Sequence, residues 1–431
     1  MRPGRLALLV SFWYPTSYSR VWQGTLCTWK DGMSSKSFVP APESIDAVVL
    51  AGTRGGRLFD LDGRRVAKPY LTVGGEPLVR RVVRAVLGAR GVGMVFVVGQ
   101  PDALEQALQP LLSENTGRLR LVEEGEDILQ NSYRAYFLHL LPARGYPAAE
   151  SLELDTALLR RYQKNHPECR RTPALFVTSD LPFLTSEAVD AFLKQAPDDA
   201  AVAVGQVDHR ELEHMRVMLG EQTTLDLWKL GAIPLKNAAV RMNNLFLLRP
   251  LLADPAVYSL LDTLYSHRWL LKQDGSVHFS NWWAIAKGVV SYSFKLRGWL
   301  RFWRGFFNFV PAVVALCLAR LTRRVGHWLS WPFRLFLARR DMEFIGSLMF
   351  GARGCLTISR GPGPAIDIDV KEAYLSLVRN EEENFRRVAR YLNEIGPGKV
   401  PVPPRTSPRR GDDFDPATEN PQAQQPHQNK H

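Results

Sequence analysis

A glycine-rich segment between residues 50 and 57 has the residue types that bind a triphosphate. It reads LAGTRGGR, and Lys68-Pro69 comes eleven residues after its last arginine. Glycines let a backbone approach phosphates closely with its N–H groups turned inward. An arginine can fork onto the β- and γ-phosphates, and a lysine can neutralise charge that builds on the α-phosphate. We therefore expect catalytic cations at Arg57 and Lys68 and further nucleotide contacts from Leu50, Ala51, Gly52, Gly55 and Gly56.

The same segment could also be an ordinary tight turn between a strand and a helix. It is not a Walker loop, because no Gly-Lys-Ser/Thr follows, and it is not the dinucleotide fingerprint. The nearby arginine and the Lys-Pro pair favour a triphosphate site over a plain turn.

Strands and helices that alternate along the chain would position this loop. Residue patterns predict strands at 46–50, 93–98, 119–122, 174–178, 200–204, 241–249 and 364–370. They predict helices at 78–87, 102–112, 128–141, 186–194 and 371–395. Such alternation predicts an α/β fold with a parallel sheet and crossover helices. Ligands bind these sheets at the carboxyl ends of the strands, where the loops after Leu50 and Thr178 both lie.

The chain divides into a core, an insert within the core and two flanking segments. We expect a core at 45–290, a basic amphipathic helical insert at 291–341, completion of the core at 342–395, and flanking segments at 1–44 and 396–431. The first flank is interpreted as an extension or a misassigned start, and the proline-rich second flank as a disordered tail. The four cysteines lack CxxC spacing, which favours reduced thiols in a cytoplasmic protein over a zinc site.

A third motif, taken together with the loop and the Lys-Pro pair, makes the chain resemble a known family. It reads Gly75-Glu76-Pro77-Leu78 and matches a Gly-x-Pro-Leu helix start that follows a Leu-Ala-Gly-x-x-Gly-x-Arg loop and a Lys-Pro pair. The chain thus resembles the MobA-like NTP transferases, nucleotidyltransferases with a glycosyltransferase-A-like (GT-A-like) fold. That group includes molybdenum-cofactor guanylyl- and cytidylyltransferases, methylerythritol-phosphate cytidylyltransferases and sugar-phosphate nucleotidyltransferases. This resemblance implies an α/β fold with three α/β/α layers, Rossmann-like, around a mixed, mostly parallel sheet. The resemblance is closest over residues 45–210.

The resemblance implies further nucleotide contacts in residues 125–132. This segment looks like the family segment that contacts base and ribose, through Gly125, Asn131 and Ser132. Its likeness to the cytidylyltransferases favours CTP over GTP. As an alternative, Asn131 and Ser132 would be ordinary helix residues.

The resemblance also implies a magnesium site. Asp180 follows a strand and precedes Leu-Pro, and Asp369 ends an Asp-Ile-Asp motif before a helix, as the family's two metal aspartates do. Magnesium takes hard oxygen ligands and usually one or two carboxylates. The alternatives are a helix cap at Asp180 and solvated strand-end charges at Asp367 and Asp369.

The implied reaction transfers a nucleoside monophosphate from an NTP to a phosphorylated acceptor and releases pyrophosphate. An anionic acceptor phosphate would attack the α-phosphorus directly, and Arg57 would meet the charge of the leaving pyrophosphate. Two alternatives stay open: a glycosyltransferase that uses a nucleotide sugar, and a non-catalytic, nucleotide-sensing membrane adaptor.

The basic charge of the protein is concentrated in one stretch. Residues 275–340 contain eleven of the 55 lysines and arginines and no acidic residue, whereas the other basic residues nearly balance the 43 acidic ones. On a helix, tryptophans and phenylalanines of this stretch share one face and arginines the other, which is typical of helices in an anionic membrane interface. We expect membrane contact from Trp299, Arg301, Trp303, Arg304, Arg320, Arg323 and Arg324.

Other interpretations of the basic stretch are a hairpin packed on the protein and a dimer interface. Its uncharged run, 305–319, contains Pro311 and is shorter than the roughly 20 residues that span a bilayer. Nucleic acid is not expected, because a wholly apolar opposite face serves no purpose there. We therefore expect a cytoplasmic protein, peripheral on the inner face of the membrane, whose acceptor is a phosphorylated small molecule or a lipid-linked phosphate.

Overall fold

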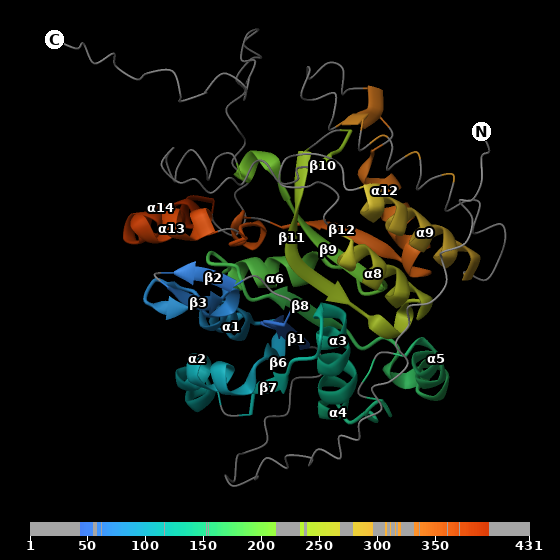
Figure 1. The fold of residues 1–431 in the computed structure, drawn as a ribbon, viewed down its shortest axis with the longest axis horizontal. Coiled ribbons are helices and arrows are strands. Elements are labelled where there is room, and N and C mark those ends of the chain that lie inside the picture. Colours follow the sequence, from blue (N-terminus) through green and yellow to red (C-terminus); the bar gives the residue numbers. More distant parts are fainter. Residues whose placement is uncertain are drawn as a thin grey trace, which may run out of the picture. The chain divides into compact units, whose positions relative to one another are not determined.

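The computed structural model describes most of the chain between residues 44 and 395 (Figure 1). The described ranges are 44–54, 58–61, 63–115, 117–151, 153, 155–212, 233–236, 239–267, 279–295, 307, 311, 315, 318–319, 332–335, 337–359, 361–369 and 371–395. The expectations for both flanking segments fall outside these ranges. So do those for Gly55, Gly56, Arg57, Trp299, Arg301, Trp303, Arg304, Arg320, Arg323 and Arg324.

One mixed sheet forms the centre of the described chain. Its strands run in the order β12 (Gly354–Ile358), β9 (Val202–Asp208), β11 (Ala239–Leu248), β8 (Ala174–Thr178), β1 (Ile45–Leu50), β6 (Val92–Gly99) and β7 (Leu119–Glu123). A short strand, β10 (Ile233–Pro234), pairs with β11. Neighbouring strands are parallel except β11, which is antiparallel to both β8 and β9. The mostly parallel sheet expected from the sequence is confirmed.

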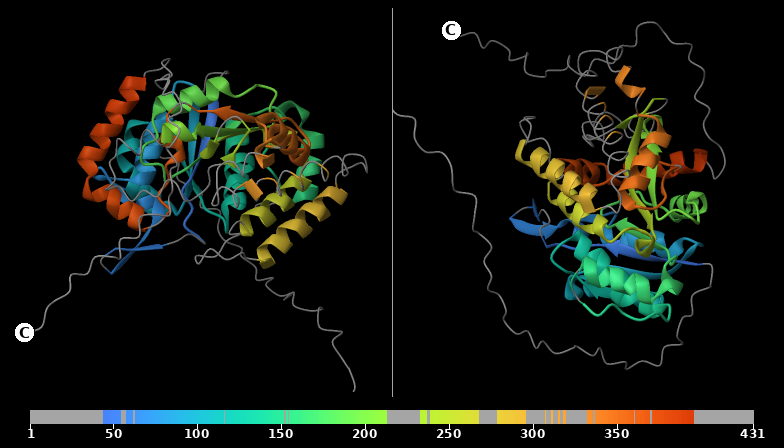
Figure 2. Two further views of the ribbon diagram at one scale, coloured as in Figure 1. Left: turned by 90° about the horizontal axis from the view of Figure 1, so that it is seen from above. Right: turned by 90° about the vertical axis from the view of Figure 1, so that its right-hand side faces the viewer.

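Helices cover both faces of this sheet (Figures 1 and 2). They are α1 (Leu78–Gly88), α2 (Pro101–Glu114), α3 (Ile128–Tyr133), α4 (Leu141–Ala143), α5 (Thr156–Asn165), α6 (Ser186–Gln195), α8 (Ala256–Ser266), α9 (Phe279–Lys295), α12 (Arg339–Phe350), α13 (Lys371–Arg379) and α14 (Glu381–Ile395). Alternate residues of β1 divide the core: Ala47 and Val49 pack with α1, α2 and α6, whereas Val48 packs with the helical run that contains α3 and α4. This alternation is what a strand between two helical layers requires. The three-layer architecture is confirmed.

Two short hairpins follow the glycine-rich loop and position the residues after it. The first joins β2 (Leu58–Leu61) to β3 (Arg64–Ala67), and the second joins β4 (Thr72–Val73) to β5 (Glu76–Pro77). Between them lies the 3₁₀ helix η1 (Lys68–Tyr70). Leu71 and Val73 pack with Tyr374 and Leu377 of α13, so this part of the chain is held against α13.

The expected helix at 128–141 is helical throughout but changes its hydrogen bonding. Between α3 and α4 lies a π-helical run, η2 (Arg134–Leu140). Asp127 caps the start, where its side chain accepts a hydrogen bond of 2.8 Å from the N–H of Gln130. The remaining short 3₁₀ helices are η3 (Pro167–Cys169), η4 (Pro250–Leu252) and η5 (Gly363–Ala365).

The expected strand at 364–370 is wrong. Its start forms η5, and residues 366–369 lie outside the sheet without regular secondary structure. Two prolines, Pro362 and Pro364, cannot donate to a sheet ladder. Gly363 also packs directly on the backbone after β8, because a Cβ at Gly363 would lie 2.1 Å from the carbonyl oxygen of Phe183. One edge of the sheet is formed by β12, which the sequence patterns did not identify.

The expected single helix at 371–395 is also wrong, since the chain breaks at Asn380 into α13 and α14. Three glutamates stand in the first turn of α14, where negative charge favours a helix N-terminus. Tyr374 and Leu377 of α13 and Val388 of α14 nevertheless share one buried cluster.

Candidate active site

The sheet topology brings three distant segments to the carboxyl end of β8. Asp180 stands two residues beyond this strand. Because β11 is antiparallel to β8, with Leu245 beside Val177, the first residues of β11 lie at the same end. Residues 366–369 lie there too, and the N–H of Ile368 donates to the carbonyl oxygen of Asp180 at 3.3 Å.

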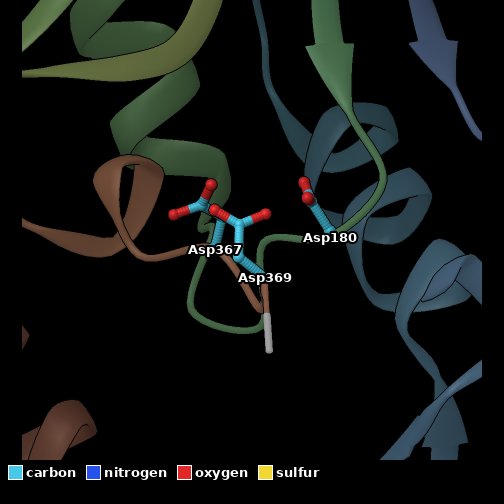
Figure 3. Close-up of side chains that lie close together, drawn as sticks. All are labelled: Asp180, Asp367 and Asp369. Atoms are coloured by element: carbon cyan, nitrogen blue, oxygen red, sulfur yellow. The ribbon is translucent and has the colours of Figure 1, made fainter. Parts of the chain in front are cut away.

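Three aspartates converge at this point (Figure 3). Asp180, Asp367 and Asp369 each offer a carboxylate oxygen, and these oxygens lie within 4.8 Å of one another. The hydroxyl of Thr178 donates to Asp180 at 2.5 Å. Helix α6 is capped by Thr185, not by Asp180, so the capping alternative for Asp180 is wrong. Three hard oxygen donors at this spacing fit the ligand preference of Mg²⁺.

Lys68 bridges two of these aspartates. Its Nζ pairs with Asp180 and lies 2.7 Å from Oδ1 of Asp369. Burial alone would lower the pKa of Lys68, but the charges of Asp180 and Asp369 outweigh burial and raise the pKa. Lys68 is therefore a cation held between the two carboxylates that were expected to bind metal.

Arg241 pairs with the third aspartate. Its Nη2 lies 2.8 Å from Oδ1 of Asp367, and both side chains are mostly buried. Burial raises the pKa of Asp367 to about 7, with added repulsion from Asp369 and Asp180, while Arg241 and Lys68 oppose the shift. Burial would also raise the pKa of Asp369, but Lys68 outweighs it and lowers that pKa. The carboxylates at positions 367 and 369 therefore differ in charge near neutral pH.

The described part of the glycine-rich loop packs against the end of β7. Thr53 donates to the buried carboxylate of Glu124 through its N–H and, at 2.9 Å, through its hydroxyl. Arg54 Nε lies 3.9 Å from the same carboxylate. A Cβ at Gly52 would lie 2.4 Å from Nδ2 of Asn131, so this position has room only for glycine unless Asn131 moves.

The expected base and ribose segment lies beside this loop. Oδ1 of Asn131 accepts a hydrogen bond of 2.5 Å from the N–H of Gly125. Ser132 instead donates to the carbonyl oxygen of Ile128, at 2.7 Å, within its own helical run. Asn131 thus contacts both Gly125 and Gly52, whereas the hydroxyl of Ser132 is used by its own helix.

Leu50 and Ala51 anchor the start of the loop through their backbones. The N–H of Ala51 donates to Val98 at 2.8 Å, and the carbonyl oxygen of Leu50 accepts from Ser179 at 3.2 Å. The two loops after β1 and β8 are therefore joined directly at their origins.

Sequence reasoning missed Glu124 and Arg241 and did not include Asp367 in the expected magnesium site. Each had a signal in the sequence: Glu124 follows a strand core, Arg241 begins a strand, and Asp367 lies two residues before Asp369. None of these signals identifies a partner without the fold.

Comparison with known proteins gives one family match. The family model of the MobA-like NTP transferase domain matches residues 47–275, slightly more than half of the 431 residues. No curated protein matches the chain.

Several solved structures are similar to this chain at low identity. A hypothetical transferase from Thermus thermophilus is 19% identical, with 77% of this chain and 99% of that chain covered and a TM-score of 0.43. A nucleotidyl transferase from Methanothermobacter thermautotrophicus is 16% identical, with coverage of 80% and 98% and a TM-score of 0.33. The 4-diphosphocytidyl-2C-methyl-D-erythritol synthase from Anaerococcus prevotii is 12% identical, with coverage of 57% and 96% and a TM-score of 0.30.

Proposed function

The chain belongs to the MobA-like NTP transferase family, and we propose that it transfers a nucleoside monophosphate from an NTP to a phosphorylated acceptor, with release of pyrophosphate. One observation carries this proposal: Lys68 lies between Asp180 and Asp369 at the carboxyl end of the sheet. At this position, two carboxylates could bind a metal ion while the lysine contacts the phosphate group that the ion also binds. The acceptor is a phosphorylated small molecule or a lipid-linked phosphate.

The aspartates are suited to hold a magnesium ion. Asp180 and Asp369 would bind it, with Asp367 beside them, and the bound ion would neutralise charge on the reacting phosphate. Lys68 pairs with both of these carboxylates, and with a cation bound to them its Nζ would be available to the α-phosphate. The acceptor phosphate is already anionic, so no side chain has to remove a proton from it.

The loop residues would hold the rest of the nucleotide. We propose that the backbone around Gly52 contacts the nucleotide, that Gly125 and Asn131 contact base and ribose, and that Arg57 meets the pyrophosphate. Glu124 fixes the loop through Thr53, so that its geometry is set before the nucleotide binds. The likeness of residues 125–132 to cytidylyltransferases favours CTP over GTP.

A pyrophosphate-release assay tests this function. The full chain is incubated with each of the four NTPs, Mg²⁺ and a panel of phosphorylated acceptors. Acceptor-dependent release with one NTP is expected, and Asp180→Asn should reduce it by roughly 10²-fold or more. The matched control is Asp102→Asn, an exposed aspartate in the first turn of α2.

Two outcomes would favour the alternatives. Tight NTP binding without turnover on any acceptor would favour the nucleotide sensor. Transfer of sugar from a nucleotide sugar, without pyrophosphate release from any NTP, would favour the glycosyltransferase.

We also propose that the enzyme works at the cytoplasmic face of an anionic membrane as a peripheral protein. This part rests on the sequence of residues 295–340, whose aromatic and basic residues would meet the lipid. Among the described helices, none is long and apolar enough to cross a bilayer.

A further inference from the structure

Helix α9 packs on α8 through one defined face. The two helices lie side by side in both views of Figure 2. A Cβ at Gly288 would lie 2.8 Å from Cγ2 of Thr263, so the helices touch closely at this glycine. One turn further on, Tyr292 is only 3% exposed and belongs to the buried cluster formed with α8. These contacts fix which side of α9 faces the protein.

The opposite side of α9 is apolar and exposed. At about 100° per residue, Trp283, Ala286 and Val290 lie about 140–160° around the helix from Gly288. The exposed fraction is 67% for Trp283 and 38% for Val290, and Ala286 between them is also exposed. Trp283, Ala286 and Val290 together form a contiguous exposed apolar patch, which is the kind of surface that serves as an interaction site.

The charges around this face identify the partner. Lys287 is exposed at the edge of the face, and α9 contains no acidic residue. The stretch 275–340, which includes α9, has eleven basic residues and no acidic one. The same stretch of a second copy, or its neighbouring part in this chain, would bring charges of the same sign against the face. An anionic lipid surface brings the opposite sign, and tryptophan with lysine is the pair that membrane interfaces favour.

We propose that the outward face of α9 docks on an anionic membrane, with Trp283 and Val290 among the lipid headgroups and Lys287 facing the lipid phosphates. This inference rests on the membrane part of the proposed function and deepens it. The sequence alone indicates membrane contact for residues 295–340. The inference adds α9, a helix whose inward face is known from the structure.

Vesicle co-sedimentation of the full chain tests the inference. The probes are vesicles of phosphatidylcholine alone and of phosphatidylcholine mixed with phosphatidylglycerol. Wild type is expected to pellet with the mixed vesicles and to dissociate at high salt. Trp283→Ser/Val290→Ser should weaken the partition at least tenfold, and Lys287→Glu should remove the preference for phosphatidylglycerol.

Val378→Ser is the matched control, because Val378 is 36% exposed on α13 and close to Val290 in type and exposure. Its vesicle binding should equal that of wild type. Circular dichroism and the Tm show that each variant is folded.

Three results would overturn the inference: vesicle binding unchanged in the double variant, no difference between the two kinds of vesicle, or no pelleting of wild type. An oligomer that dissociates in the double variant while vesicle binding persists would show an interface between copies instead. Pyrophosphate release with a soluble acceptor is measured on the same samples and should be equal in all of them. Its absence from every sample would contradict the proposed chemistry and leave the vesicle result to be judged separately.

Discussion

At the scale of single residues, Lys68 and a metal ion compete for the same two carboxylates. In Lys68→Met, Asp180 and Asp369 lose their cation and repel each other, so the Tm measured in EDTA should fall. Adding Mg²⁺ should raise the Tm of the variant more than that of wild type, because the ion replaces the lost charge. Pyrophosphate release should still fall by roughly 10²-fold, since the α-phosphate loses its lysine.

Lys194→Met provides the control, because Lys194 is an exposed lysine in the last turn of α6. Its Tm should respond to Mg²⁺ as wild type does. Equal magnesium shifts in the Lys68 and Lys194 variants would show that the ion binds elsewhere.

The raised pKa of Asp367 predicts that metal binding depends on pH. Burial and two neighbouring carboxylates hold this pKa at about 7, so the metal-free protein carries a proton there below that pH. A metal ion favours the ionised form, and the proton must leave. The affinity for Mg²⁺ should therefore rise about tenfold per pH unit up to about pH 7 and level off above it.

Calorimetric titration with Mg²⁺ in buffers of different ionisation enthalpy measures both the affinity and the proton released. Asp367→Asn has no proton to lose, so its affinity should change little across the same pH range. A wild-type affinity that is equal at pH 6 and pH 8 would contradict this prediction.

The sequence predicted part of this site and could not predict the rest. Lys68, Asp180 and Asp369 lie in motifs whose residue types indicate phosphate and metal chemistry. Arg241 and Asp367 are 126 residues apart, and only the antiparallel course of β11 makes them partners. Glu124 looks like any charge at the end of a strand until the loop folds onto it. Local sequence patterns do not reveal which distant side chains the fold pairs, or the pKa values that result from the pairing.

At the scale of elements, the close packing of the loop after β1 against the start of α3 can be tested at Gly52. Gly52→Ala would place a Cβ 2.4 Å from Asn131 and 3.1 Å from Glu124, so the loop or Asn131 must move. NTP affinity should fall at least tenfold, since a shift of about 1 Å misplaces the loop's phosphate-binding groups. Isothermal titration with the NTP identified in the release assay measures the loss.

Gly346→Ala is the control for the added methyl group. Gly346 lies in α12 with nothing within 4 Å of its Cβ position, so alanine fits. It should stabilise the protein by about 0.5–1 kcal/mol, because alanine favours a helix over glycine. NTP affinity in Gly52→Ala as high as in Gly346→Ala would show that the loop tolerates displacement.

Elements with strong local patterns were predictable, and elements fixed by their surroundings were not. The buried strands β1, β6 and β8 are short apolar runs between turns and were recognised. Strand β12 is a partly exposed edge strand of five residues, and nothing in its pattern separates it from a loop. The segment 364–370 alternates like a strand, but Pro362 and the contact of Gly363 with Phe183 hold it across the site instead.

At the scale of the whole molecule, the fold separates stability from chemistry. The two apolar layers lie on the faces of the sheet, while the charged cluster lies beyond the carboxyl end of β8. The chemistry at this end could therefore change while most core side chains stay the same. The net charge of +12 also belongs mainly to residues 275–340 and not to this sheet.

A buried ion pair remote from the aspartate cluster tests this separation. Arg144 donates to Asp46 at 2.6 and 2.9 Å and to the carbonyl oxygen of Ser44, and the carboxylate of Asp46 also accepts from Met94. Arg144→Met leaves that carboxylate buried without its cation, so the free energy of unfolding should fall by about 3–5 kcal/mol. Arg160→Met is the control. It removes the more exposed ion pair between Arg160 and Asp254, which lie 3.7 Å apart, and should lower the free energy of unfolding by less than about 1 kcal/mol.

Urea unfolding measures both losses, and pyrophosphate release per folded molecule should match wild type in each variant. A lower rate per folded molecule in Arg144→Met would mean that the start of β1 transmits strain to the loop that follows it, and that stability and chemistry are coupled through this strand.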